Sequence, residues 1–334
     1  MLFRDIIGQE DIKHHMQTAL REDKISHAYI INGEKESGKM TLAMAFVQTL
    51  FCEKGGDEPC GECPSCKKVE EKCHPDLLFV SHENPKMIKV QEIRDQVVDQ
   101  MMYRPYSAKR KVFIIEDAEL MNASAQNAVL KSIEEPPSFV TVILLTSNAS
   151  AMLDTIRSRC IMLNIVPALK EQDQIKKKLM QTYGRAEYEA ENILSFAQGN
   201  VGKAYELATN EEFTGLIQKV LDLTAKAHRM KQIEIENFAA ELKNASKSEE
   251  IDLKEYLELL VLWYRDVLLY KATANTEYLF FKDHVREIKK QAQRGSYKNL
   301  NDCLDSIEKA RKELRSNIDI ELIFTVLMQV MKEI

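Results

Sequence analysis

The feature that most constrains the fold is a glycine-rich loop between an apolar stretch and an amphipathic one. Residues 27–32 predict a buried strand, and residues 40–50 predict a helix with one apolar face. Between them, Gly33, Gly38 and Lys39 have the spacing of a phosphate-binding loop, in which backbone N–H groups surround phosphate oxygens and the lysine reaches the terminal phosphates. The alternative is an ordinary strand-to-helix turn. The order strand, loop, helix favours a nucleotide-binding α/β domain.

The loop departs from the usual pattern at its last position. Met40 stands where a Ser or Thr hydroxyl would help to hold Mg²⁺, and a thioether is a poor ligand for that ion. Thr41 carries a hydroxyl one residue later, which on a helix is a rotation of about 100° away from the phosphates. Glu34 and Glu36 add negative charge beside the loop. We therefore expect weak nucleotide binding at most, and no hydrolysis.

A second apolar stretch ends in carboxylates. Residues 111–115 predict a strand that is followed by Glu116 and Asp117, which reverses the Asp-then-Glu order used to hold Mg²⁺ and to orient an attacking water. Solvated carboxylates at a strand end are the alternative interpretation. Residues 140–148 predict a third strand that ends in small polar residues, any of which could sense a γ-phosphate. Strands alternate with helices over roughly the first half of the chain, which favours a mainly parallel sheet.

Most of the cysteines form a cluster early in the chain. Two overlapping C-x-x-C steps lie close to one earlier and one later cysteine, in a loop rich in glycine and proline. In a reducing compartment such a cluster is typical of a tetrahedral Zn²⁺ site, and four thiolates make a closed structural site. The expected ligands are Cys52, Cys60, Cys63 and Cys66. Cys73 or His74 could replace Cys52, and reduced free thiols are the alternative to a metal site.

Composition excludes several classes of protein. The 334 residues carry 46 basic and 52 acidic side chains, a net charge of −6, which argues against a nucleic-acid binder that uses its whole surface. The hydrophobic fraction of 45% is ordinary for a globular protein. The longest apolar runs are too short to span a bilayer, and the first residues do not read as a signal peptide. We expect a cytoplasmic location and no membrane partner.

Several motifs occur together in an order that resembles the bacterial clamp-loader ATPases of the AAA+ family. Besides the glycine loop and the cysteine cluster, they are DIIGQE at 5–10, HAY at 27–29, HPD at 74–76, NAVLKSIEEPP at 127–137 and SRC at 158–160. Specific matching covers about the first 205 residues of the chain. The resemblance implies a parallel AAA+ α/β domain over residues 1–166, with a zinc-binding insertion at about 52–73. It also implies a helical lid domain at 167–208 and a helical collar for oligomerisation at 209–334.

Within that family, the departures favour a non-hydrolysing stator of the DNA polymerase III clamp loader over a motor subunit. Met40 and the Glu116-Asp117 pair break two motifs, and Gly202 stands where the motor has a sensor arginine, with Lys203 one position out of phase. The resemblance assigns Arg159 as a finger offered to a neighbouring subunit's ATP. The alternative for Arg159 is a helix cap or a local ion pair, and the alternative for the whole chain is an active ATPase of tau/gamma type.

The implied partners are the tau/gamma and delta subunits, with the sliding clamp and primer-template DNA reached through a hetero-oligomeric complex. A zinc-dependent nucleic-acid module is a third interpretation, but the cysteine loop is acidic. Two long apolar helices are expected at residues 257–270 and 322–331, with Trp263 in the core of a bundle. Between these two helices lies a run of basic residues. Such a run is usually a solvated helix face, and DNA binding is the alternative. Its members are Lys282, Arg286, Lys289, Lys290, Arg294 and Lys298.

Overall fold

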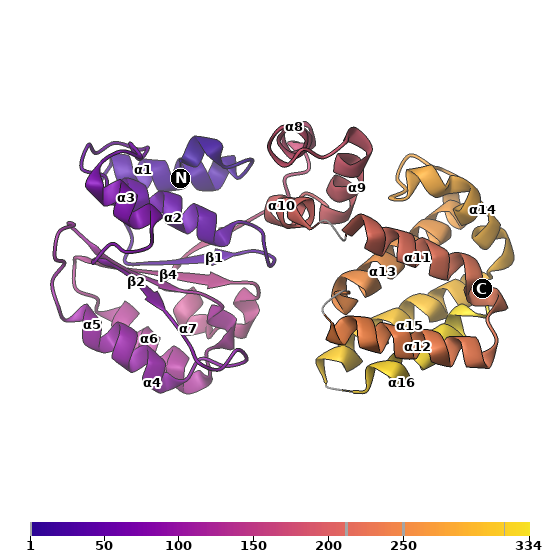
Figure 1. Cartoon of the computed structure of the whole chain (residues 1–334). Helices are drawn as coiled ribbons and strands as arrows, with labels where there is room; N and C mark the ends of the chain where they lie inside the picture. Colours follow the sequence, from indigo (N-terminus) through magenta and orange to yellow (C-terminus); the bar gives the residue numbers. More distant parts are fainter. Residues whose placement is uncertain (1, 211–212, 249–250, 317) are drawn as a thin grey trace. The chain divides into compact units, whose positions relative to one another are not determined.

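The computed structural model describes residues 2–210, 213–248, 251–316 and 318–334 (Figure 1). These residues form two compact units, each with a core of its own. The first unit contains the residues up to Lys177 together with Ala197–Tyr205, and the second contains Lys178–Phe196 and Glu206–Ile334. The division into three domains near residues 166 and 208 stays a prediction.

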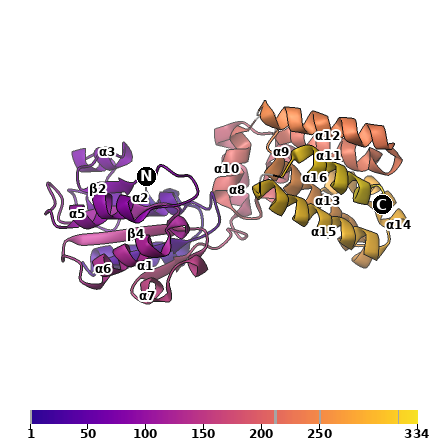
Figure 2. The same cartoon turned by 90° about the horizontal axis from the view of Figure 1, so that it is seen from below.

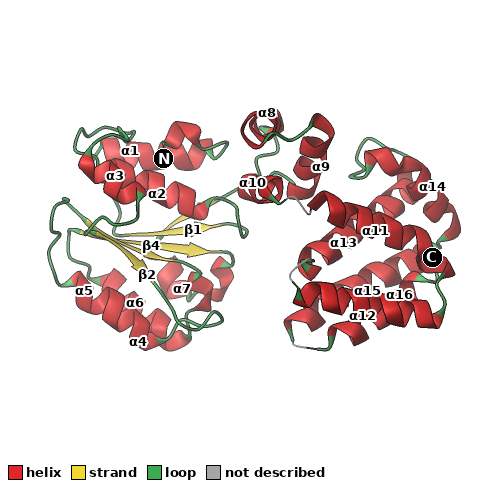
Figure 3. Ribbon diagram, viewed as in Figure 1, coloured by secondary structure: helices red, strands yellow, loops and turns green. Residues whose placement is uncertain are grey.

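The centre of the first unit is a five-stranded parallel sheet, drawn in yellow in Figure 3. The strand order is β2-β3-β4-β1-β5, so the strand that leads into the glycine loop lies inside the sheet, between β4 and β5. The strands are β1 (Ala28–Asn32), β2 (Leu77–Val80), β3 (Lys111–Ile115), β4 (Val140–Thr146) and β5 (Ile161–Asn164). The predicted parallel α/β fold is confirmed, and the carboxyl ends of β1, β3 and β4 meet at one edge.

Helices cover both faces of this sheet (Figures 1 and 2). On one face lie η1 (Phe3–Asp5), α1 (Glu10–Arg21), α2 (Lys39–Leu50) and α3 (Pro64–Glu70). On the other face lie α4 (Val90–Ile93), the π-helical turn η2 (Arg94–Val98), α5 (Asp99–Met101), α6 (Ala123–Glu134) and α7 (Asp154–Arg157), with the short η3 (Ala118–Leu120) and η4 (Ala149–Ala151) after β3 and β4. The sheet is therefore sandwiched between two helical layers.

The strands read as continuous apolar runs because both faces of the sheet are buried. Alternate residues of β1 point to opposite sides: Tyr29 joins the core on the α2 side, where its ring contacts Phe46 edge-on, whereas Ile30 joins the core on the α6 side with Val129. Two apolar cores fix the sheet from above and below. The polar ends of the strands are thereby held in a rigid frame.

Three helices follow the sheet: α8 (Gln172–Tyr183), α9 (Glu187–Ala197) and α10 (Val201–Thr209). The beginning of α10 belongs to the first unit, and most of α9 belongs to the second. Gly199 and Asn200 make the turn that starts α10, with Gly199 at a φ of +83°, a conformation that favours glycine. This turn brings α10 to the glycine loop.

The second unit is built mainly from long helices that pack against one another. They are α11 (Phe213–Lys226), α12 (Gln232–Lys247), α13 (Leu253–Thr273), α14 (Val285–Arg294), α15 (Tyr297–Arg315) and α16 (Ile320–Met331), with the short η5 (Ala227–Arg229) and η6 (Lys282–His284). Trp263 of α13 is 2% exposed, and its indole N–H donates to Oε1 of Gln291 in α14 at 2.6 Å. The predicted helical region and the core position of Trp263 are confirmed. Within the part of the chain that the structure describes, no helix combines the length and the apolarity needed to cross a bilayer.

Candidate functional site

The glycine loop connects the end of β1 to the start of α2, as the sequence predicts. Gly33 follows β1 directly and donates its N–H to the carbonyl of Thr146 at the end of β4 (3.1 Å). Gly38 caps α2 with a φ of +89°, a conformation that favours glycine, and its carbonyl accepts the first turn's bond from Leu42. The helix N-terminus therefore points toward the loop, which is the arrangement that binds phosphate in other proteins.

The lysine of the loop is bound to the loop itself. The ammonium group of Lys39 donates to the carbonyl oxygens of Gly33 (2.9 Å) and Glu34 (2.7 Å). Burial lowers the pKa of Lys39, and four nearby carboxylates oppose that shift by stabilising the charged ammonium. These carboxylates belong to Glu119, Asp117, Glu36 and Glu116. The surroundings of the lysine are thus already negative, which opposes the approach of a polyphosphate.

Met40 belongs to the core instead of the loop. Its side chain packs against the apolar cluster on the α2 side of the sheet. A thioether held in this way offers no oxygen to a cation. Met40 therefore has a packing role at the position where a hydroxyl ligand would stand, because its side chain adds apolar surface at the start of α2.

The end of β3 contains a carboxylate that the sequence interpretation missed. Glu116 and Asp117 are exposed, and Asp117 has a φ of +48°. Glu119, two residues further on, accepts hydrogen bonds from both the backbone N–H (3.1 Å) and the hydroxyl of Ser147, beyond β4. Burial acts to raise the pKa of Glu119, but hydrogen bonds from Ser147, from the side chain of Thr146 and from its own backbone N–H together hold this pKa below its ordinary value. One of the small polar residues that could sense a γ-phosphate, Ser147, is therefore bonded to a glutamate.

The start of α10 contacts the glycine loop directly. The side-chain amide of Asn200, which is 7% exposed, donates to the carbonyl of Lys35 at 2.9 Å. A β-carbon on Gly202 would overlap the carbonyl oxygen of Glu36. From the sequence, Gly202 was noted only as a position without an arginine, and Asn200 was missed. The local signal that could have identified Asn200 is its position directly before the start of a helix.

Arg159 lies between α7 and β5 and is 41% exposed. Its guanidinium forms an ion pair with Oε1 of Glu134 at the end of α6 (3.0 Å) and donates to the carbonyl of Thr155 (3.1 Å). Both anchors belong to the same chain. In the free chain, Arg159 thus forms a local ion pair, which the sequence analysis gave as the alternative to a role as an arginine finger. The ion pair is open to solvent.

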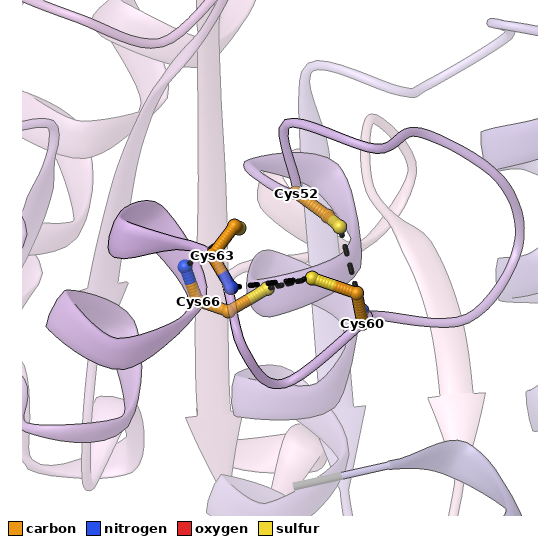
Figure 4. Close-up of side chains that lie close together, drawn as sticks. All are labelled: Cys52, Cys60, Cys63 and Cys66. Carbon is orange, nitrogen blue, oxygen red and sulfur yellow. Dashed lines mark hydrogen bonds between the residues drawn. The ribbon is translucent and has the colours of Figure 1, made fainter.

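Four cysteine sulfurs converge at the loop before α3 (Figure 4). The ligand atoms of Cys52, Cys60, Cys63 and Cys66 lie within 4.8 Å of one another, and the Cys60 and Cys66 sulfurs are 3.9 Å apart. Tetrahedral Zn–S bonds of about 2.3 Å would place the sulfurs about 3.8 Å apart. The backbone N–H groups of Glu62 and Cys63 lower the pKa of the Cys60 thiol to about 6. This cluster could hold a metal ion such as zinc.

The two alternative ligands lie outside the cluster. The Cys73 thiol is exposed and contacts a carboxylate oxygen of Glu71 at 3.6 Å. The His74 ring packs on Phe51 with 4.5 Å between ring centroids, and its two nitrogens contact the Ser65 hydroxyl and the backbone N–H of Asp76. The structure therefore brings Cys52 to the other three cysteines, and His74 has a structural role beside them.

Comparisons with known proteins relate the chain to subunits of DNA polymerase III. Residues 8–168 match the family described as "DNA polymerase III, delta subunit", and residues 222–332 match "DNA polymerase III, delta subunit, C terminal". The chain is 28% identical to DNA polymerase III subunit delta' of Bacillus subtilis over 319 residues, which covers 95% of this chain and 94% of that protein. It is 29% identical to subunit tau of the same organism over 332 residues, which covers 94% of this chain but 58% of tau.

A solved gamma subunit-related protein from Thermotoga maritima aligns with 95% of this chain and 98% of its own, at 20% identity and a TM-score of 0.47. The parallel sheet, the glycine loop, the four-cysteine cluster and the helical C-terminal region together define a protein of the AAA+ clamp-loader class. More narrowly, the chain belongs to the DNA polymerase III delta-prime subunit family and is a clamp-loader subunit.

Proposed function

We propose that this protein is the stator of its clamp loader: it does not hydrolyse ATP, and it supplies Arg159 to the nucleotide of a neighbouring subunit. The observation that carries the proposal is the state of its own loop. Lys39 is bonded to the loop's carbonyl oxygens, carboxylates surround it, and Met40 packs into the core. A site of this kind lacks the oxygen that would hold Mg²⁺ and opposes the phosphates by charge.

The chemistry of Arg159 suits a role in trans. Its ion pair with Glu134 is exposed on both sides, and pairs of this kind contribute about 0–1 kcal/mol. Exchanging that carboxylate for the γ-phosphate of a neighbour would therefore cost little. A guanidinium that neutralises charge on a transferring phosphoryl group can be worth about 10³–10⁵ in rate.

The proposed role requires an assembly with subunits that bind and hydrolyse ATP. The tau and gamma proteins are relatives of this chain, and we propose that one of them supplies the ATP site that receives Arg159. A delta subunit, the sliding clamp and primer-template DNA complete the proposed complex. We propose that this complex acts in the cytoplasm.

The cysteine cluster is proposed as a structural zinc site. Four thiols fill a tetrahedral coordination shell, so no position is left for a substrate. Backbone N–H groups point at three of the sulfurs: those of Cys60, Cys63 and Cys66 donate to Cys52, Cys60 and Cys63, each at 3.4 Å. Such bonds stabilise thiolates, which are the form that binds metal. The ion would tie the turn-rich loop to the start of α3.

The test is the ATPase rate of a loader reconstituted with clamp and primed DNA. We expect Arg159→Ala to lower turnover by at least tenfold. Arg157→Ala is the matched control, because Arg157 is two residues away, 38% exposed and paired with Asp154 in its own helix. The control should keep the wild-type rate. Equal rates for Arg159→Ala and wild type, with assembly intact in both, would remove the finger from the proposal.

An active ATPase of tau/gamma type is the second candidate. It is favoured by the identity to tau over nearly the whole chain and by the retained Gly33, Gly38 and Lys39. An ATPase assay of the isolated chain distinguishes the two. Hydrolysis that Lys39→Ala abolishes would support the second candidate and contradict the stator.

A further inference from the structure

The second unit carries a row of cations that the proposed function does not use. From residue 282 to residue 298 a cation recurs at every fourth position, with one more beside the row, and Asp283 and Glu287 are the only carboxylates in the segment. Six cations and two carboxylates give 6 − 2 = +4, in a chain whose net charge is −6. We name this row the α14 basic face. Four of its members lie in α14, one in η6 before it and one in α15 after it: Arg286, Lys289, Lys290 and Arg294, with Lys282 and Lys298.

All six cations are exposed to solvent. Ile288, Gln291 and Ala292 are buried and fix which side of α14 faces the bundle. Arg286 and Lys290 lie on the opposite side, at a spacing of four residues, and Lys289 and Arg294 flank them. Side chains four apart on a helix are neighbours, about 5–6 Å between β-carbons, so Arg286, Lys290 and Arg294 form a line of charge along α14.

The charges are also unusually free. None of the six side chains takes part in a hydrogen bond or an ion pair within the described part of the chain. Other cations of the same unit are paired: Lys243 bridges Asp319 and Glu321, and Arg311 bridges Glu258 and Glu308. Like charges four residues apart repel and destabilise a helix, so this row opposes the folding of α14 unless an anion neutralises it.

The basic face borders a hollow of about 450 Å³. Lys290 and Arg294 line it from α14, and His228 and Arg229 line it from η5. The carboxylates of Asp222 and Glu287 and the buried Trp263 also line it. The Nδ1 atom of His228 is buried there and has no hydrogen-bond partner among the described residues. Cations from two segments far apart in sequence thus converge on one concave surface.

We propose that the α14 basic face binds the phosphate backbone of nucleic acid. A line of guanidinium and ammonium groups without carboxylate partners complements a line of phosphates, and affinity of this kind does not depend on base sequence. The choice of nucleic acid over another polyanion rests on membership of the DNA polymerase III family, not on the stator role.

The test measures binding of the isolated full-length chain to fluorescent duplex DNA by anisotropy over a series of salt concentrations. The triple variant Arg286→Gln, Lys290→Gln and Arg294→Gln should bind about tenfold more weakly or worse. Its slope of log affinity against log salt should be smaller by about 2–3, because each lost phosphate contact removes about 0.9. A thermal melt no lower than that of wild type would show that α14 is still folded.

The matched control is Lys309→Gln, Lys312→Gln and Lys332→Gln, which removes the same charge from exposed positions in the same unit. Its affinity and slope should equal those of wild type. Equal losses of DNA affinity in the two triple variants would show that the effect comes from net charge alone, and this would overturn the proposal. DNA binding by the wild type that neither variant weakens would overturn it as well. Polyglutamate binding in place of DNA would assign the face to an acidic protein. None of these results depends on ATP hydrolysis, so they leave the stator role to its own test.

Discussion

The carbonyl oxygen of Glu36 in the glycine loop lies against the α-carbon of Gly202 at the start of α10, so closely that a β-carbon would overlap it. Asn200 strengthens this contact by donating to the carbonyl of Lys35, next to Glu36. Glycine, which has no β-carbon, is the residue that lets α10 rest on the loop at this position. Gly202 and Asn200 therefore form one contact with the glycine loop.

We predict that Gly202→Ala destabilises the first unit although alanine is the better helix former. The new methyl group must push α10 from the loop, and overpacking of this kind costs about 1–3 kcal/mol. Gly215→Ala in α11 is the control, because nothing lies within 4 Å of its β-carbon position and the change should stabilise by roughly 0.5–1 kcal/mol. Chemical denaturation measures both. A stabilised Gly202→Ala protein would show that the contact is not maintained in solution.

Nucleotide affinity should respond to the carboxylates around Lys39. Glu119→Gln removes the charge that acts most strongly on the lysine and keeps an oxygen that can accept from Ser147. We expect ATP binding without metal to tighten by about fivefold, which corresponds to roughly 1 kcal/mol of removed repulsion. Calorimetric titration of the isolated chain measures it.

Glu70→Gln, at an exposed position at the end of α3, is the matched control and should leave the affinity for ATP unchanged.

Met40→Thr should not produce ATP hydrolysis, because the hydroxyl alone does not correct the charge of the site. Tight binding of Mg·ATP by the unaltered chain would contradict the interpretation of the loop as degenerate.

The cysteine cluster predicts one zinc ion per chain. Cys63→Ser should lower the zinc content of purified protein to well below one, because a serine hydroxyl replaces a thiolate in a four-ligand shell. Cys73→Ser should leave the metal content unchanged, since that thiol lies outside the cluster. Metal analysis of the three proteins decides the matter, and limited proteolysis should cut the Cys63→Ser protein faster in the loop between Cys52 and Cys63. Absence of zinc from the wild type would reject the site.

The parts of this site that could be predicted from sequence are those that local spacing determines. The strand, the glycine loop and α2 are consecutive, and the four cysteines fall within a short segment, so their convergence needs little beyond a turn. The sequence favours Cys52 but leaves Cys73 and His74 open as replacements, because all three lie close in sequence to the C-x-x-C steps. The choice among them depends on how α2 ends and on the packing of His74 against Phe51.

The contacts that close the loop join residues far apart in the chain. Asn200 and Lys35 are 165 residues apart, and Glu119 and Ser147 are 28 apart on different strand ends. Nothing in the local pattern marks Glu119, because a carboxylate after a strand is also typical of a solvated turn. Likewise, the motif around Arg159 indicates a finger, but its pairing with Glu134 follows from the packing of α6 beside α7.

A buried carboxylate in the second unit makes its stability depend on pH. Asp266 is fully buried in α13, and burial raises its pKa from 3.8 to about 6, although the backbone N–H groups of Phe280 and Phe281 donate to it at 2.7 and 2.9 Å and act to lower it. Between these two pKa values the folded state holds more protons than the unfolded state, so the free energy of unfolding falls as pH rises from about 4 to about 6 and stays reduced above that.

The substitution Asp266→Asn keeps an oxygen for both N–H groups and removes the charge. The variant should be more stable than wild type by roughly 1–2 kcal/mol at neutral pH and should lose that advantage near pH 4. Urea denaturation of both proteins across this pH range measures the difference. Asp302→Asn, at an exposed position in α15, should give a curve parallel to that of wild type. An Asp266→Asn curve that is also parallel would mean that the Asp266 carboxylate is not the source of the pH dependence.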